Sequence, residues 1–586
     1  MSDATNAQSV PPQPSPLPLP RRIADAYVDA LVVLDPVTGT MLGDRGSHGA
    51  LPDFSPDGGD QIAALAGDTL RRLAGTGQLP GADADIDAGG TGTGGGTDAA
   101  VERNCARLLR ERLTAELAMH ETGETLRSLS TIYSPVHRVR TALLLTPTKD
   151  AEDWRAAAAR LRAVPASLES YRASLAEGLR RGLPGGPAQV TTMIEQLDEW
   201  LGVRGGWFAR FTAAGPASLR TELDSAARQA ADGAARLRDW LREVYGPGTE
   251  GTPDVVGRER YAVCARHFTG LDLDPDEAYE YGWSEFHRVL GEMRTEAAKV
   301  LPGAPTPWAA LKHLDTHGHA VEGEEAVRAW LQELMDETIG RLDGTHFDIA
   351  EPVRRVESRI APAGGGAAPY YTAPSQDFSR PGRTWLPTMG RTRFPTYELV
   401  ATWYHEGVPG HHLQLAQWAH LSGRLSRYQT GVGSVSANTE GWALYAERLM
   451  DELGFLAHPE HRLGYLDLQM MRAVRVVIDL GMHLGLDIPA HSPFHPGGRW
   501  TPQLAGEFLA AHSGRPDAFV RNELIRYQGA PGQAIGYKLG ERAWLRGREA
   551  ARTARGRDFD LKRWHMAALS QGSLGLADLE AELAVL

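Results

Sequence analysis

The sequence predicts a mainly α-helical fold with one small β-sheet. Along most of the chain after Ala100, apolar residues recur at intervals of three and four, the period of a helix with one buried face. Clusters such as Pro184–Pro187 and Pro302–Pro305 interrupt this pattern and mark helix ends. Between residues 354 and 388 the pattern changes to alternating and aromatic residues. We therefore expect two or three short strands directly before the segment with the strongest functional signal.

The predicted elements follow in order along the chain. A polar, proline-rich tail at 1–20 precedes short helices at 23–34 and 61–73, and the Gly/Asp/Thr-rich stretch 81–99 predicts a mobile loop. A further helix begins near Thr396, whose hydroxyl is a plausible N-cap. The remaining helices are expected at 100–132, 152–183, 188–211, 217–244, 274–300, 323–342, 440–454, 463–486, 503–511, 517–526, 533–553 and 559–584. We divide the chain into the tail 1–20, a helical region 21–345 and a catalytic region 346–586.

Composition excludes several classes of protein. The net charge of -13 argues against a nucleic-acid or anionic-membrane partner, because both require a basic surface. Cys105 and Cys264 are the only cysteines, which excludes a disulfide framework and a thiolate metal site. Residues 1–20 lack the apolar core of a signal peptide, and no run of 18 apolar residues predicts a spanning helix. We therefore expect a cytoplasmic protein without a membrane partner.

The segment Tyr404–His412, Tyr-His-Glu-Gly-Val-Pro-Gly-His-His, carries the strongest functional signal. Hydrolytic zinc sites use His and Glu ligands, with a further Glu as general base. In the usual His-Glu-x-x-His motif the histidines lie four apart, whereas His411 and His412 follow His405 by six and seven residues. The spacing must therefore be explained before a zinc site is accepted.

The residues between the histidines supply that explanation. In an unbroken helix, six residues rotate the chain to about 240° from its start, so His405 and His411 would face apart. Pro409 has no N–H for an intrahelical hydrogen bond, and the flanking glycines give the backbone freedom, so we expect a kink or a bulge of about two residues. This bulge would bring His411 to His405 as second ligand. His412 would lie about 10 Å along the helix, and we assign it to ligand support or substrate contact.

The candidate third ligand lies downstream, in the segment Thr439-Glu440-Gly441. Glu440 opens a predicted helix after a small, polar loop, and we expect it to be the third ligand. Glu447 lies two turns later on the same face, where it can hold a histidine N–H. Glu406 is then the general base. Single histidines are usually structural and a Glu at a helix start is usually a capping charge, but the combination favours a metal site.

The two segments His-Glu-Gly-Val-Pro-Gly-His-His-Leu-Gln and Asn-Thr-Glu-Gly-Trp-Ala-Leu-Tyr-Ala-Glu resemble the bacterial family labelled domain of unknown function 885. That family is similar to helical zinc metallopeptidases of the carboxypeptidase Taq and oligopeptidase type. The resemblance covers residues 350–550 best and implies a large helical metallopeptidase-like fold with a central cleft. It supports His411 over His412, since those peptidases share a Gly-His before the helix continues, and it supports Glu440 and Glu447.

Downstream residues supply further candidates. Arg475 and His483 belong to a stripe on one predicted helix, which is either an ion-pair ladder or, as the family's similar helix implies, a face that holds a substrate carboxylate. Tyr527 and Tyr537 fit the family pattern and are candidate donors to the oxyanion of a tetrahedral intermediate. Lys538 could bind a terminal carboxylate.

These residues predict a zinc-dependent hydrolase of peptide or amide bonds with one Zn2+ per chain. The resemblance favours a carboxypeptidase- or dipeptidase-like enzyme that acts on small peptides. Two alternatives stay open: a zinc amide hydrolase that tailors a specialised metabolite, and a non-catalytic relative. The presence of Glu406 argues against the second, because a site that only binds metal does not need it.

Overall fold

The computed structural model describes residues 19–76, 96–202, 206–361 and 368–586. Helices make up 69% of the structure, and the few strands are short, so the predicted mainly α fold with a small sheet is confirmed. The predicted tail lies outside the described residues apart from 19 and 20, and the predicted loop 81–99 lies outside them up to residue 95. Residues 96–99 already belong to a helix.

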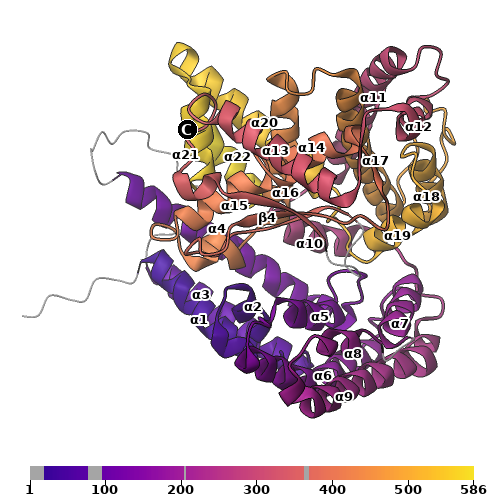
Figure 1. The fold of residues 1–586 in the computed structure, drawn as a ribbon. Helices are drawn as coiled ribbons and strands as arrows, with labels where there is room; N and C mark the ends of the chain where they lie inside the picture. The colour runs from indigo at the N-terminus through magenta and orange to yellow at the C-terminus, as the bar shows by residue number, and fades with distance from the viewer. Residues whose placement is uncertain (1–18, 77–95, 203–205, 362–367) are drawn as a thin grey trace, which may run out of the picture.

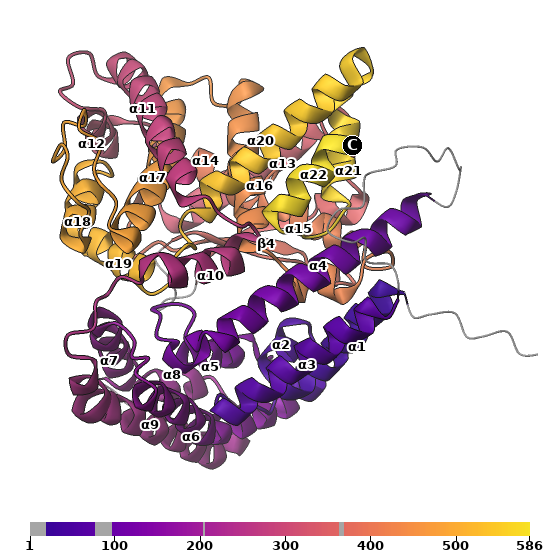
Figure 2. The ribbon, with the colours of Figure 1, turned by 180° about the vertical axis from the view of Figure 1, so that it is seen from behind.

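The N-terminal helices form the lower part of the molecule in Figures 1 and 2. Five of them begin with a proline, whose fixed φ suits the first helical turn, and Ser55 and Asp150 cap two by accepting backbone N–H bonds. They are α1 (Pro20–Leu34), α2 (Pro36–Met41), α3 (Pro56–Ala74), α4 (Gly96–Glu121), α5 (Pro135–Leu145), α6 (Ala151–Arg180), α7 (Pro187–Leu201), α8 (Gly206–Ala213) and α9 (Arg220–Trp240).

The remaining helices form the larger, upper part (Figure 1). They are α10 (Gly257–Thr269), α11 (Pro275–Val300), α12 (Pro307–His317), α13 (Glu324–Leu342), α14 (Thr396–Glu406), α15 (His411–His420), α16 (Ser436–Glu452), α17 (Pro459–Leu484), α18 (Pro502–Ala511), α19 (Asp517–Gln528), α20 (Gly536–Arg555), α21 (Leu561–Leu569) and α22 (Leu576–Val585). The single helix predicted at 559–584 is two helices, because the chain turns at Gly572, whose φ is 78°. Thr396 is the first residue of α14 and Pro395 its N-cap, so the predicted cap is one residue late.

The predicted strands form a three-stranded sheet in the order β2-β4-β3. β4 (Gly382–Leu386) pairs in parallel with β2 (Val356–Ile360) and antiparallel with β3 (Tyr370–Thr372). A second pair, β1 (Ala320–Glu322) with β5 (Arg393–Pro395), is antiparallel. The three-stranded sheet lies against α15. Gly382 of β4 is so near that a Cβ atom added to it would stand only 2.4 Å from Nδ1 of His412. The sheet is therefore beside the candidate site, as predicted.

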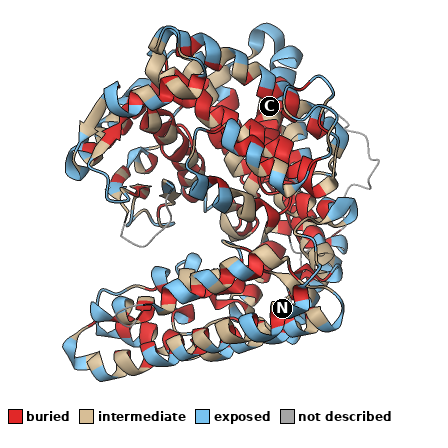
Figure 3. Cartoon of the chain, turned by 90° about the vertical axis from the view of Figure 1, so that its right-hand side faces the viewer, coloured by how far each residue is buried: buried red, intermediate tan, exposed pale blue. Residues whose placement is uncertain are grey.

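Two separate hydrophobic cores support these helices. The smaller contains residues of α5 to α9 with the segments that join them, and the larger contains α1, α3, α4 and most of the chain from α10 onward. In Figure 3 the buried residues are densest in the larger core. The predicted division at residue 345 stays a prediction. Among the described residues, no helix has both the length and the apolar character needed to cross a bilayer.

Candidate metal centre

The helical conformation is interrupted completely between α14 and α15. α14 ends at Glu406, and α15 starts afresh at His411. Between them the Val408–Pro409 peptide is cis, and Gly410 N donates to the Tyr404 carbonyl oxygen at 2.9 Å. The interruption expected at Pro409 is present, but as a complete break between two helices and not as a two-residue bulge within one. A full break frees the second helix to take its own direction, which brings His411 back to His405.

The break and α16 bring three side chains together. Nε2 of His405 lies 3.4 Å from Oε2 of Glu440, and Nε2 of His411 lies 3.7 Å from the same oxygen. The two imidazole rings meet edge to face, with centroids 4.8 Å apart. Within the described ranges, these residues are the one group of three His, Cys, Asp or Glu side chains whose potential ligand atoms all lie within 4.8 Å of one another.

The donor set fits a divalent cation. Two imidazole nitrogens and one carboxylate oxygen are the protein ligands of many catalytic zinc sites, which leave a fourth position open. Oε2 of Glu440 is buried and has no hydrogen-bond partner among the described residues. Burial alone would raise the pKa of Glu440, but the adjacent His405 and His411 rings hold it well below its usual range. A partly exposed carboxylate whose buried Oε2 faces two histidines is the arrangement expected of a metal ligand. Glu440 lies in the second turn of α16, which begins at Ser436 rather than at Glu440 as predicted.

Glu447 lies where the two-turn spacing from Glu440 predicts. Its Oε1 is 2.7 Å from Nδ1 of His405, and its Oε2 accepts a hydrogen bond from Nε2 of Gln469 at 3.2 Å. Burial lowers the pKa of His405, but the carboxylates of Glu440 and Glu447 outweigh it and raise that pKa to about 10. Glu447 thus orients the His405 ring so that Nε2 faces Glu440.

Glu406, the last residue of α14, lies next to the same histidines. Its side chain is buried, and burial raises the pKa of its carboxyl group although His405 and His411 act in the opposite direction. A raised pKa brings a carboxyl group closer to the range in which a general base is effective near neutral pH. Glu406 is not one of the three residues whose potential ligand atoms converge, so its carboxyl group is left over beside that group.

His412 points away from the triad. Nε2 donates to the Val353 carbonyl oxygen at 2.6 Å, and Nδ1 accepts from the Tyr371 hydroxyl at 2.9 Å. The side chain is fully buried, and burial lowers its pKa to about 4. With both nitrogens bonded to protein, His412 has no atom for a metal or a substrate. It anchors the sheet to α15, so its predicted substrate contact is wrong.

The two candidate phenols have different surroundings. Tyr537 is the second residue of α20, and the Arg475 guanidinium lies 5.0 Å from its ring centroid. Burial and then the charge of Glu440 raise the pKa of Tyr537, which keeps the phenol protonated as a donor. Tyr527 is buried: its hydroxyl accepts from Nε of Arg475 at 2.8 Å and donates to Glu523. Tyr537 is partly exposed, whereas Tyr527 belongs to an internal network.

Lys538 and His483 are turned inward and bond to protein groups, which corrects the prediction that Lys538 binds a terminal carboxylate. All three Lys538 ammonium donors are used, on Glu285, Gln469 and Glu541. His483 is buried, with Nε2 bonded to the Tyr527 carbonyl oxygen at 3.2 Å, and burial lowers its pKa to about 4. Arg475 is also committed, because its guanidinium pairs with Glu523 at 2.8 Å. Sequence reasoning missed Gln469 and Glu523, for which no motif offered a signal.

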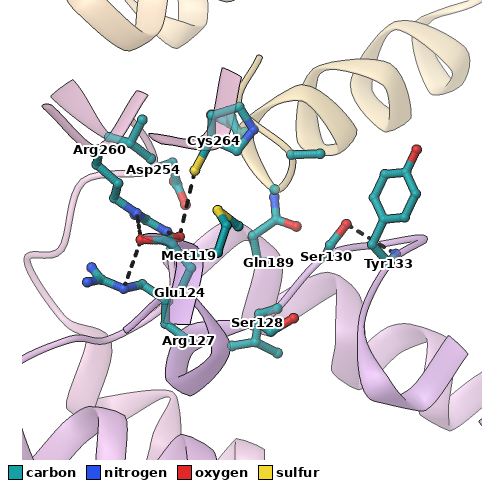
Figure 4. Close-up of a pocket in the computed structure, with 18 of the residues that line it drawn as sticks. Met119, Glu124, Arg127, Ser128, Ser130, Tyr133, Gln189, Asp254, Arg260 and Cys264 are labelled. Carbon is teal, nitrogen blue, oxygen red and sulfur yellow. Dashed lines mark hydrogen bonds and ion pairs between the residues drawn. The ribbon is translucent and has the colours of Figure 1, made fainter. Parts of the chain in front are cut away.

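A pocket of about 320 Å³ lies where the two cores meet. In Figure 4, Tyr133 lies at one side of it and the ion-paired Glu124, Arg127 and Arg260 at the other. Burial, and then the nearby Tyr537 and Glu440, raise the pKa of Tyr133, so the Tyr133 side of the pocket is within electrostatic reach of the metal centre. Residues 528–531, between α19 and α20, complete the wall.

The sequence pattern of the family described as "Bacterial protein of unknown function (DUF885)" matches residues 36–583. The chain belongs to this family. The predicted resemblance to DUF885 is thus confirmed. The family description assigns no activity, and no curated protein matches the chain.

Solved structures similar to this DUF885 chain show the same fold. A "putative lipoprotein" from Colwellia psychrerythraea has a TM-score of 0.80 at 21% identity, covering 96% of this chain and 98% of its own. A "putative lipoprotein of unknown function" from Shewanella oneidensis has a TM-score of 0.71 at 17% identity, covering 96% of this chain and 99% of its own. The cytoplasmic location predicted from composition is wrong in the light of these neighbours, because lipoproteins are attached to membranes.

Proposed function

We propose that this DUF885 protein is a zinc-dependent hydrolase of peptide or amide bonds in small substrates. The observation that carries the proposal is the convergence of His405, His411 and Glu440 on one point, with Glu406 beside them and not needed as a ligand. A site that only stored metal would not need a fourth side chain that carries a buried carboxyl group. The position of Glu406 therefore favours catalysis over a non-catalytic binding role.

The proposed chemistry assigns one role to each side chain. A bound zinc ion would polarise the substrate carbonyl and make water more acidic. Glu406 would accept a proton from the attacking water and pass it to the leaving amine. Tyr537 would donate a hydrogen bond to the developing oxyanion, since burial and Glu440 keep its phenol protonated. Glu447 would hold His405 in place throughout.

The size of the neighbouring pocket supports a small substrate. At about 320 Å³ it suits a few residues of a peptide and not a folded protein. A substrate held at the metal centre would extend past Tyr133 towards Arg127 and Arg260 (Figure 4). This arrangement favours a carboxypeptidase- or dipeptidase-like activity.

A digest of a defined peptide library, read by mass spectrometry, tests the proposal. Zinc-loaded protein should shorten peptides by one or two residues from one end, and a chelator should stop the reaction. Glu406→Gln, loaded with the same metal, is the matched control for contaminating peptidases. Cleavage that persists in Glu406→Gln, or no cleavage of any peptide or simple amide by zinc-loaded protein, would overturn the proposed activity.

A further inference from the structure

A chain of buried polar side chains runs inward from His405 across four helices. Beyond the 2.7 Å contact of His405 Nδ1 with Glu447, Gln469 on α17 donates from Nε2 to Glu447 Oε2 at 3.2 Å. Lys538 on α20 donates from Nζ to Gln469 Oε1 at 2.5 Å. All four side chains are buried, and α14, α16, α17 and α20 pack against one another in the larger core. The interior therefore contacts the metal centre through one continuous series of hydrogen bonds.

The direction of each hydrogen bond in this series is determined at its inner end. The Lys538 ammonium group has three N–H donors and no acceptor, and its other two donors go to Glu285 and Glu541 at 2.9 and 2.6 Å. Gln469 must therefore turn its carbonyl oxygen to Lys538. The reverse amide orientation would place donors against the ammonium group and an oxygen against the Glu447 carboxylate. Both ends select the same orientation.

This orientation has a consequence at His405. Because Gln469 presents N–H to Glu447, and the Arg472 guanidinium lies 3.9 Å from Oε1, both oxygens of Glu447 serve as acceptors. An acceptor at Oε1 requires a proton on Nδ1 of His405. The lone pair of the ring is then on Nε2, which is the nitrogen that faces Glu440 and His411.

We propose that Lys538 and Gln469 are positioning residues that set which ring nitrogen of His405 binds the metal. Neither residue touches the centre, and each acts through the next side chain in the series. The proposal rests on the metal centre of the proposed function, but it does not depend on hydrolysis. Losing the Gln469 amide should weaken zinc binding by about tenfold, as the loss of a contact behind a metal ligand does.

The test compares Gln469→Met with Gln429→Met. Gln429 is also a fully buried glutamine, but its carbonyl oxygen serves Ser426 and not the metal centre. For wild type and both variants, the zinc dissociation constant is measured by chelator competition, the visible spectrum is recorded with Co2+ in place of zinc, and the melting temperature is measured without metal. Both variants should lose stability. Only Gln469→Met should also bind zinc about tenfold more weakly and shift the Co2+ spectrum.

The outcomes separate this proposal from the proposed activity. Equal zinc affinity and equal Co2+ spectra for wild type and Gln469→Met would overturn the positioning role alone. Wild-type protein that binds no zinc would overturn the metal centre and this role with it. Weakened zinc binding in a protein that cuts no peptide would support the role and overturn the hydrolase. If Gln469→Met does not fold, Gln469→Glu, which keeps the shape but turns an acceptor towards Glu447, decides by the same two measurements.

Discussion

Gly410 lies directly against the carbonyl oxygen of His405. A Cβ atom on Gly410 would stand 2.0 Å from that oxygen, and 2.4 Å from the carbonyl oxygen of Tyr404. Since real Cβ atoms do not approach so closely, no residue but glycine fits here without moving the backbone. This contact is what allows α15 to start where His411 reaches Glu440.

Gly410→Ala should therefore separate His411 from His405. We expect the free energy of unfolding to fall by about 1–3 kcal/mol, as overpacking does, together with a loss of zinc affinity. Denaturant unfolding and chelator competition measure the two effects. Gly423→Ala is the control, because no atom lies within 4 Å of the position of its added methyl group. Unchanged zinc affinity in Gly410→Ala would contradict the role of the break.

His411→Ala should mainly lower the affinity for zinc, and His412→Ala should mainly lower the stability of the protein. His411→Ala removes a ligand, so zinc affinity should fall by more than about 100-fold, beyond the loss from an outer contact, with little change in metal-free stability. His412→Ala leaves the Val353 carbonyl and the Tyr371 hydroxyl without their partner, and should lower the free energy of unfolding by about 2–4 kcal/mol. A greater loss of zinc from His412→Ala would reverse the assignment of the second ligand.

Glu406→Gln should retain zinc and lose turnover. The amide keeps the size of the side chain but cannot accept the proton, so kcat should fall by about 10²–10⁴-fold on whichever substrate the library digest identifies. Metal analysis of the same sample provides the control for the site itself. A variant with wild-type turnover would exclude Glu406 as the base.

Tyr537→Phe and Tyr527→Phe should distinguish the two phenols. Tyr537→Phe should lower kcat by about 100-fold through loss of the oxyanion donor, with stability nearly unchanged. Tyr527→Phe removes a partner of both Arg475 and Glu523, so its main effect should be on the melting temperature. If Tyr527→Phe lowers kcat more than Tyr537→Phe does, with stability unchanged, then Tyr527 and not Tyr537 is the oxyanion donor.

Removing the metal should destabilise the protein. Zinc that binds only the folded state adds about 2.7 kcal/mol to the free energy of unfolding at a free concentration 100 times its dissociation constant. The melting temperature of wild type should therefore rise on zinc addition, and that of His411→Ala should not. An equal rise in both proteins would place the bound zinc somewhere other than this centre.

Much of the candidate site could be predicted because its signals are local. Pro409 and its flanking glycines break a helix by their own covalent structure, wherever they occur. Glu447 follows Glu440 by two turns, so the helical period alone places both on one face. Four helices, α2, α5, α10 and α12, were missed; of these α2, with 6 residues, is too short to establish a period.

The inward-facing residues could not be predicted from sequence. Lys538 looked available for a substrate carboxylate, but it pairs with Glu285, which is 253 residues away in the chain. His483 bonds to a carbonyl 44 residues away, and the Gln469–Lys538 contact spans 69 residues. Helical spacing shows which side chains share a face, but not which other helix covers that face.

The helical fold, the interruption at Pro409 and the candidate metal-binding residues follow from local sequence alone, because periodicity, ring constraint and ligand chemistry belong to each residue and its near neighbours. The packing of distant segments placed His411 against Glu440, enclosed His412 and Lys538, and left Tyr537 partly exposed while Tyr527 is buried. Those choices depend on packing between segments far apart in the chain, since a buried polar group must find its hydrogen-bond partner wherever the fold provides one.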